Sequence, residues 1–288
     1  MKYGLFFAYL VVCSFLLQGC WVQEAPVEKK HTLSLIADHL THEDSLTISH
    51  ISRKQRLTID IRVMRPEKIL QHVQSLRYNA AVDVVLIEDE ELRRQLRDLK
   101  AFAPITDKAL FSQLERQFSN KHHLWVPVSH DPLVLVTGKD STGNCTTISS
   151  WRTAGKRQPI IAFNAHSEAY RKALRRTKHL GWINMDNSSI RGPERLYALS
   201  ELVDRSARKD STAVTRKSDC LFYLVDNKRY VSRMTTVSVY AYARNKKSAT
   251  LFLQNFLAHA YNVADGRNQL PAKKNVKPNW RIRSLIIR

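Results

Sequence analysis

The chain has 288 residues, of which 43% are hydrophobic, and a formal net charge of +20. This hydrophobic fraction fits a folded, soluble body. The basic residues are scattered rather than clustered among stacking aromatic residues, which argues against a nucleic-acid-binding protein. The charge indicates either a solvated basic surface or an anionic partner, such as lipid head groups, lipopolysaccharide phosphates or an acidic ligand.

The N-terminal segment has the layout of a secretory signal, with one basic residue, Lys2, before a run of uncharged and mostly apolar residues. The run ends at Leu-Gln-Gly-Cys20, which resembles the lipobox of bacterial lipoproteins, where the cysteine is lipidated and becomes the new N-terminus. Residues 1–19 are therefore predicted to be a signal peptide, Cys20 a lipid anchor and residues 20–30 a tether. An uncleaved membrane anchor and a buried apolar helix remain alternatives, because about 20 apolar residues can span a bilayer.

Two cysteines remain after the signal peptide with Cys13 is removed and Cys20 is lipidated. Cys145 and Cys220 can form a disulfide in an oxidising compartment. A single sequence does not show whether they are close, so their pairing stays open. The cysteine and histidine spacings do not indicate a zinc site.

Predicted strands and helices alternate in the first half of the mature chain. Apolar and polar residues alternate at 32–37 and 57–63, as in strands, and residues 82–87 form the apolar run of a strand covered on both faces. Apolar residues recur at helical spacing in 66–76 and 89–100. Strand, helix and strand in this order indicate an α/β fold with a largely parallel sheet.

Predicted strands and helices also follow one another in the rest of the chain. Extended segments are predicted at 125–128 and 133–137, separated by a turn at 129–132. The later predicted elements are a strand at 159–163, helices at 167–180 and 193–203, a strand at 221–225 and a helix at 249–261.

The order of these elements resembles the type II periplasmic substrate-binding proteins of ABC importers, and within them the ferric-ion-binding branch. The resemblance implies two α/β lobes that close on a ligand in the cleft between them. Residues 31–136 with about 237–288 would form lobe 1, and residues about 137–236 lobe 2. The segments that carry the resemblance are AAVDVVLIE at 80–88, LKAFAPI at 99–105, HLWVPVSHDPLVLVTGKD at 123–140, DCLFYLVDNKRYVSRM at 219–234 and SATLFLQNFLAHAYNVA at 248–264.

The resemblance also implies a set of metal ligands. The branch holds ferric ion with a glutamate and two adjacent tyrosines, often with a histidine, because a hard trivalent cation prefers oxyanion ligands. Glu88 falls on the glutamate, Tyr230 on the second tyrosine, and His39 close to the histidine. Two simpler interpretations stay open: Glu88 favours the N-terminus of the next helix, and His39 is an ordinary surface residue.

Arg229 replaces the first tyrosine of this ligand set. A guanidinium stays protonated and repels a bare ferric ion, but it forms a bidentate, charge-assisted pair with a carboxylate or phosphate. The arginine that helps to bind the accompanying anion in the family is also missing, and Ser129 and His130 stand in its loop. Arg229, Asn227, Ser129 and His130 are therefore candidate ligand-binding residues.

The sequence thus predicts a lipid-anchored solute-binding protein at the periplasmic face of the envelope, which serves the permease and ATPase of an ABC importer. Ferric iron or an iron-containing anionic complex is the expected cargo, and no cofactor is required. The alternatives are a binder of a small oxyanion and a non-transport envelope lipoprotein with a degenerate cleft. An enzyme is not expected, because the sequence has no Gly-x-Ser-x-Gly elbow, His-Glu-x-x-His or Walker motif.

Overall fold

The computed structural model describes residues 32–75, 82–118, 122–138, 161–162, 183–184, 194–208, 219–223, 225–226, 229–230 and 232–286. The predicted signal peptide, the anchor Cys20 and the tether lie outside these ranges, as does the predicted helix at 167–180. None of the helices within these ranges has an apolar stretch of the length that spanning a bilayer requires.

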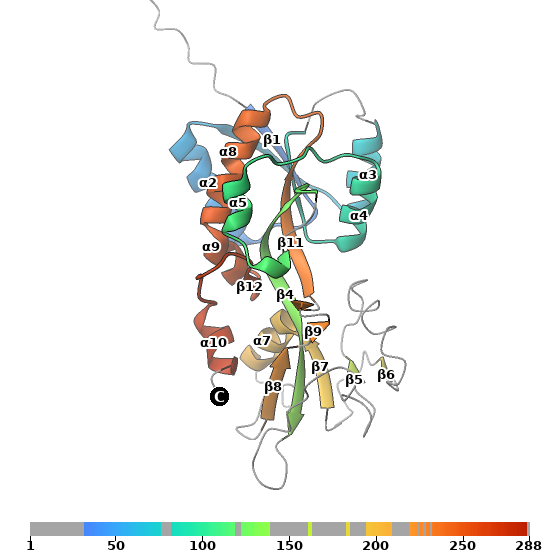
Figure 1. The fold of residues 1–288 in the computed structure, drawn as a ribbon, viewed down its shortest axis with the longest axis vertical. Helices are drawn as coiled ribbons and strands as arrows, with labels where there is room; N and C mark the ends of the chain where they lie inside the picture. The colour runs from blue at the N-terminus through green and yellow to red at the C-terminus, as the bar shows by residue number, and fades with distance from the viewer. Residues whose placement is uncertain are drawn as a thin grey trace, which may run out of the picture. The chain divides into compact units, whose positions relative to one another are not determined.

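The first part of the sheet is built from parallel strands near the N-terminus (Figure 1). Strand β1 (Thr32–Ala37) lies between β2 (Thr58–Val63) and β3 (Val84–Ile87) and is parallel to both. Strand β11 (Ser232–Val239) then pairs antiparallel with β3. All four residues of β3 are buried, as the continuous apolar run predicts for a strand covered on both faces.

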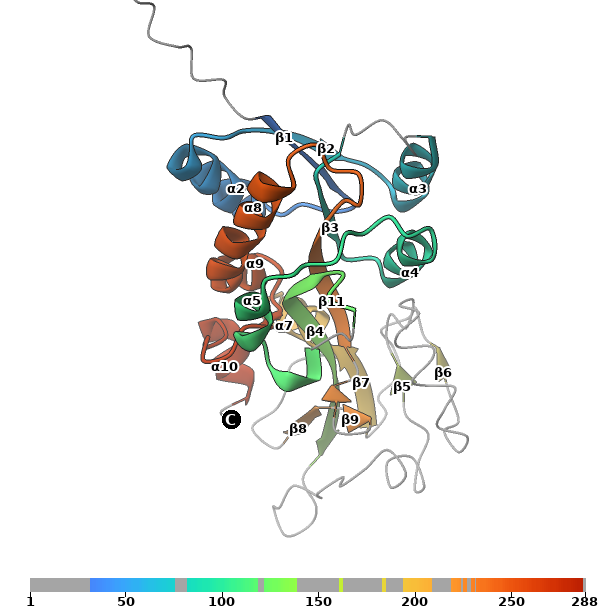
Figure 2. The ribbon, with the colours of Figure 1, turned by 45° about the horizontal axis from the view of Figure 1, so that its top comes forward.

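Helices cover both faces of these strands, as Figures 1 and 2 show from two directions. Helices α2, α8 and α9 lie on one face, and α3 and α4 lie on the other. Their apolar side chains and those of the strands form one large core. The bounds are α2 His42–Gln55, α3 Pro66–Ser75, α4 Glu90–Asp98, α5 Lys108–Ser112, η1 Arg116–Phe118, α8 Lys246–Ala258 and α9 Ala260–Asp265.

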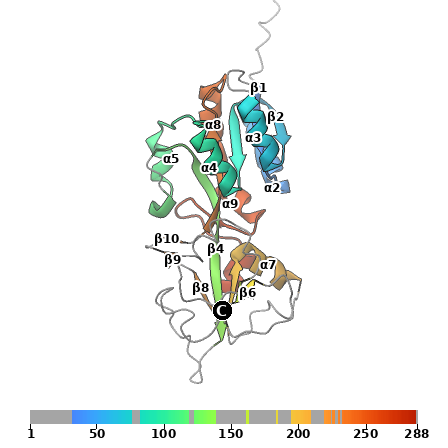
Figure 3. The same ribbon diagram turned by 90° about the vertical axis from the view of Figure 1, so that its right-hand side faces the viewer.

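One long strand, β4 (Val126–Gly138), replaces the two extended segments that the sequence predicts. The turn predicted at 129–132 is wrong, because these residues continue the strand and pair with β11. Beyond Pro132, β4 pairs with β7 (Glu194–Ala198) and β8 (Asp219–Tyr223). Figure 3 shows β4 extending from the strands of the first core to the level of α7 and β8.

A second, smaller core forms around this distal half of β4. It contains Val134 and Val136 of β4, Tyr197 of β7, and side chains of α7 (Leu199–Ala207) and α10 (Trp280–Ile286). The predicted helix at 193–203 is therefore only partly correct, because its first residues pair as β7 with β4 and β5. The predicted division into lobes stays a prediction, but α10, which it assigns to lobe 1, packs into this second core.

Cys220 on β8 is buried and disulfide-bonded. Cys145 lies outside the described residues, so the pairing of Cys145 with Cys220 stays a prediction.

The sheet as a whole is mixed, with the order β2-β1-β3-β11-β4-β7-β5-β6 among the described strands, and with β8 and β12 also paired to β4. A mixed sheet with helices on both faces of its first part confirms the predicted α/β fold class. The prediction of a largely parallel sheet is wrong, because β11 and β4 pair antiparallel with their neighbours. The remaining strands are β5 Ile161–Ala162, β6 Ile183–Asn184, β9 Val225–Asp226, β10 Arg229–Tyr230 and β12 Leu270–Pro271.

Candidate functional site

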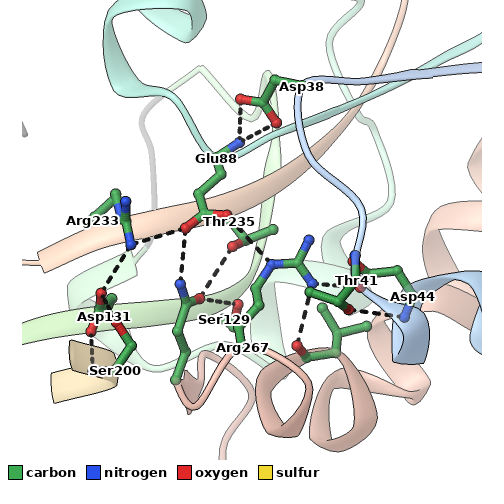
Figure 4. A network of polar contacts seen from close by, with 12 residues as sticks. Asp38, Thr41, Asp44, Glu88, Ser129, Asp131, Ser200, Arg233, Thr235 and Arg267 are labelled. Atoms are coloured by element: carbon green, nitrogen blue, oxygen red, sulfur yellow. Dashed lines mark hydrogen bonds and ion pairs between the residues drawn. The ribbon is translucent and has the colours of Figure 1, made fainter. Parts of the chain in front are cut away.

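A network of polar side chains lies where β1 and β3 end beside the middle of β4 and β11 (Figure 4). Asp38 directly follows β1, and Glu88 directly follows β3. In open α/β sheets, ligands bind beyond the carboxyl ends of the strands. This position and the predicted role of Glu88 make the network the candidate site.

Glu88 is at the centre of the network, and its carboxylate already has three partners. Its Oε1 atom forms an ion pair with Arg233 Nη2 at 3.1 Å and accepts a hydrogen bond from Gln269 Nε2 at 3.2 Å. Its Oε2 atom lies 3.7 Å from Arg267 Nε. The charge of this largely buried carboxylate is thus balanced by two guanidinium groups from distant parts of the chain.

Arg267 is fixed on the inner side of Glu88 by a buried ion pair. Its Nη1 atom donates to Asp44 Oδ1 and, at 3.4 Å, to the Val263 carbonyl oxygen. The Arg267 and Asp44 side chains are only 2% and 0% exposed. The chain approaches α2 closely here, since a Cβ atom at Gly266 would lie 2.7 Å from Glu43 Cβ. Glycine is therefore required beside Arg267.

Arg233 lies on the outer side of Glu88, with 35% of its side chain exposed. Its Nη2 atom is shared with Asp131, whose Oδ2 atom is 3.2 Å away. Asp131 is fully buried in β4 and also accepts hydrogen bonds from the N–H of Ser200 at 2.9 Å and from its hydroxyl at 2.7 Å. Burial raises the pKa of Asp131, while Arg233 and Ser200 act in the opposite direction.

Neutral side chains complete the centre of the network. The Ser129 hydroxyl donates to Gln269 Oε1 at 2.6 Å, and the Thr235 hydroxyl donates to the same oxygen at 3.2 Å. With its oxygen held by two donors, the Gln269 amide must direct its NH₂ group toward Glu88. This arrangement fixes the orientation of the Glu88 carboxylate.

The N-terminus of α4 carries its own carboxylates. Asp38 accepts hydrogen bonds from the N–H of Glu88 at 3.0 and 2.9 Å and from the N–H of Asp89 at 2.7 Å. Asp89 in turn caps the helix by accepting from the N–H of Leu92 at 2.6 Å. Burial raises the pKa of Asp38, and the two backbone donors oppose that rise.

The two other helices that begin at the network are bound at their first turns in different ways. Thr41 and Asp44 form a reciprocal capping box on α2. Helix α7 has no side-chain cap of its own, and Asp131 from β4 binds its first turn instead. One first-turn N–H group of α4 and one of α7 thus donate to a carboxylate, whereas the N–H of Asp44 in α2 donates to the Thr41 hydroxyl.

The structure brings two of the predicted site residues, Glu88 and Ser129, into the network. His130 points elsewhere: it is buried, and its ring centroid lies 4.5 Å from that of Phe118. Burial lowers the pKa of His130 to about 3, so the imidazole is neutral at physiological pH. His39 is exposed and follows Asp38. In the described part of the chain, no three His, Cys, Asp or Glu side chains are grouped to hold a metal ion.

For the remaining predicted ligands, the described part of the structure contains no side chains. Arg229 and Tyr230 form β10, which pairs antiparallel with β9; their side chains lie outside the described part of the structure, as does Asn227. Their roles in binding stay predictions.

The sequence did not single out Arg233, Arg267, Gln269 or Asp44. Their roles depend on contacts between distant segments, which periodicity cannot show. One local signal was available: Thr41 and Asp44 have the spacing of a capping box and mark the start of α2, a helix that the strand and helix pattern did not reveal.

Comparison with known proteins identifies the fold of this chain but no sequence family. No family model matches the chain, and no curated protein matches it by sequence. Solved structures do match over most of the chain. Apo FutA2 from Synechocystis PCC6803 has a TM-score of 0.70 at 15% identity and covers 89% of this chain and 90% of its own. The ferric iron-binding protein A of Mannheimia haemolytica, in an open conformation, has a TM-score of 0.71 at 12% identity and covers 88% and 89%.

A third similar structure contains a ligand. It is IdiA (FutA) of Trichodesmium in complex with iron and citrate, with a TM-score of 0.68 at 13% identity and coverage of 88% of this chain and 90% of its own. The chain therefore has the two-lobed α/β fold of type II periplasmic binding proteins, as predicted from its sequence. Of these three structures, one is named a ferric iron-binding protein and one contains iron and citrate.

Proposed function

We propose that the protein is the periplasmic solute-binding component of an ABC importer and that its cargo is ferric iron in an anionic complex. The observation that carries this proposal is the pairing of Glu88 with both Arg233 and Arg267. The neighbours' fold supports a binding role rather than a catalytic one. The permease and ATPase of the importer would be its partners.

A bare ferric ion is a poor match for this arrangement. It would have to replace two guanidinium groups on Glu88 and then remain near their positive charges, which repel it. A chelator with carboxylate groups brings negative charge of its own. It can pair with the half-exposed Arg233 while Glu88 and Tyr230 contribute oxygen ligands to the metal. The complex of Trichodesmium IdiA with iron and citrate is a precedent for such a cargo on this fold.

The same arginines also support the competing function, the binding of a small oxyanion without iron. Titration of the protein with ferric citrate, citrate and inorganic phosphate separates the two. The proposal predicts a visible phenolate-to-iron charge-transfer band and a raised melting temperature with ferric citrate only. Stabilisation by phosphate or citrate alone, without colour, would favour the oxyanion function, and no response to any of the three would contradict both.

The charge-transfer band should depend on one tyrosine. Tyr230→Phe is expected to abolish it, because the phenolate is the chromophore. Tyr261→Phe is a matched control, since Tyr261 is 43% exposed on α9, and it should retain the band. Equal colour in both variants would remove Tyr230 from the proposed ligand set.

Arg229 tests how the anion is recognised. If Arg229 pairs with the chelator, Arg229→Ala should weaken binding of ferric citrate by about 2–5 kcal/mol. Arg229→Tyr would instead supply a second phenolate and should favour ferric ion over its citrate complex. Calorimetry on both variants measures the two effects, and unchanged binding in both would exclude this loop from the site.

The location of the protein at the membrane is proposed from its sequence. Lipidation of Cys20 would fasten the protein to the periplasmic face of the envelope, because two or more acyl chains give stable anchoring. Metabolic labelling with palmitate should mark the wild-type protein and not the Cys20→Ser variant. Equal labelling of both proteins would contradict the anchor and would leave the cargo proposal unaffected.

A further inference from the structure

The segment Lys273–Arg283 is strongly basic and exposes a tryptophan. It contains no acidic residue. Trp280 is 65% exposed, and the Arg281 guanidinium carbon lies 5.8 Å from the centroid of its ring. We call this stretch the C-terminal basic segment. Its basic residues are Lys273, Lys274, Lys277, Arg281 and Arg283.

Helix α10 holds the second half of this segment in a fixed orientation. The Asn279 side chain accepts a hydrogen bond from the N–H of Ile282 at 2.9 Å and so caps the helix. Ile282 and Leu285 are buried in the second core, next to α7. The opposite side of α10 is therefore presented to solvent. Its exposed residues are Trp280, Arg281, Arg283 and Ser284.

The first half of the segment is attached to the first core. The N–H of Lys274 donates to the Gln113 carbonyl at 2.8 Å, and the Lys274 ammonium donates to the Ser112 carbonyl at 2.8 Å. Lys277 is exposed and precedes Trp280 by three residues, a span of at most about 11 Å. Arg281 follows Trp280 directly, so Lys277, Trp280 and Arg281 are close enough to contact one anionic surface together.

We propose that the C-terminal basic segment docks on a membrane surface that contains anionic phospholipids. Lysine and arginine near such a surface each strengthen binding by about fivefold, and tryptophan prefers the boundary between head groups and acyl chains. A merely solvated basic segment would explain the lysines and arginines, but it gives no role to a large apolar side chain in water. The docking depends neither on the cargo nor on the lipid anchor.

The experiment measures the fluorescence of Trp280 on vesicles with brominated acyl chains, which quench tryptophan at the interface. The full chain has five tryptophans, so the Trp280 signal is taken as the difference between the wild type and Trp280→Phe. The signal should be quenched on vesicles rich in phosphatidylglycerol, unquenched on pure phosphatidylcholine and restored by high salt. An unquenched signal on the anionic vesicles, or equal quenching on both, would overturn the proposal.

A matched pair of charge-reversal variants identifies the surface. The triple variant Lys277→Glu, Arg281→Glu and Arg283→Glu should lose the quenching, with affinity for anionic vesicles reduced more than tenfold. It leaves Ile282 and Leu285 in place, so an unchanged melting temperature is the expected sign that α10 remains packed. The control triple reverses the exposed residues Arg53, Lys246 and Lys247 and should keep the quenching. Equal loss in both triples would show that total charge, and not this segment, governs binding.

Discussion

The two sides of Glu88 differ in how firmly their arginines are held. On the inner side, Arg267 is almost fully buried and is paired with the fully buried Asp44. On the outer side, Arg233 is 35% exposed and divides one nitrogen between Glu88 and Asp131. The inner arginine thus acts as a fixed counter-ion of the fold. The outer one can exchange its protein partners for a ligand more readily, because water already reaches it and Ser200 would still donate two hydrogen bonds to Asp131.

The largest expected effect comes from breaking the inner side. Arg267→Ala leaves Asp44 buried without its ion-pair partner, and such a loss costs about 3–5 kcal/mol of folding free energy. Urea denaturation of the variant measures this cost. The double variant Arg267→Met with Asp44→Leu removes both charges and should be more stable than Arg267→Ala alone. A double variant as unstable as the single one would show that packing, and not charge, dominates the inner side.

Strand β4 provides the next test, because its side chains point alternately toward the network and toward the core. Ser129 and Asp131 face the network, whereas His130 between them packs against Phe118. The folded-state pKa of His130, about 3, lies below its ordinary value of 6.5. The unfolded chain therefore binds more protons between these pH values, and folding stability must fall as the pH falls through this window.

The expected size of this acid effect follows from linkage. Between pH 7 and pH 5, His130 should remove about 2 kcal/mol of stability. His130→Leu should lose this acid sensitivity, because the variant has nothing to protonate at that position. Denaturant unfolding at the two pH values, compared between wild type and variant, isolates the contribution of His130 from that of other groups. Equal acid sensitivity in both proteins would mean that His130 is not buried as the structure shows.

The sequence predicted the strands of the core better than it predicted the candidate site. Strands β1, β2 and β3 were expected within a residue or two of their bounds, because burial leaves apolar residues in β1 and β3, and β2 keeps an alternating sequence although none of its residues is buried. Strand β4 was misjudged, since Ser129 and Asp131 are typical turn residues. They are tolerated in a buried strand because distant residues satisfy their polar groups: Gln269, 140 positions away, for Ser129, and Ser200 and Arg233, 69 and 102 positions away, for Asp131.

The candidate site was predictable only in part, for the same reason. The resemblance to ferric-binding proteins pointed to Glu88, and the structure places Glu88 at the centre of the network. Its two arginine partners come from β11 and from the segment after α9. No local pattern marks those arginines, so the charge balance on Glu88, on which the proposed cargo depends, can be seen only in the tertiary structure.

The smallest expected effect comes from the outer side, and it depends on pH. Arg233→Ala should destabilise the protein by only about 1 kcal/mol at pH 7, because Arg233 is partly exposed to water and Ser200 still donates two hydrogen bonds to the buried Asp131. Asp131 has a folded-state pKa above its ordinary value of 3.8 because of burial, and Arg233 opposes that rise. Removing Arg233 should therefore raise the pKa of Asp131 further. The unfolded chain of the variant then ionises Asp131 more easily than the folded chain does. The resulting loss of folding stability grows as the pH rises above 3.8 and disappears below it.

The difference in folding stability between wild type and Arg233→Ala should therefore shrink from pH 7 to pH 4. Arg233→Lys keeps a positive charge, so its difference in stability from wild type should be smaller at both pH values. A difference that stays constant with pH would mean that Arg233 stabilises the fold by packing rather than by charge. It would then be no more exchangeable than Arg267.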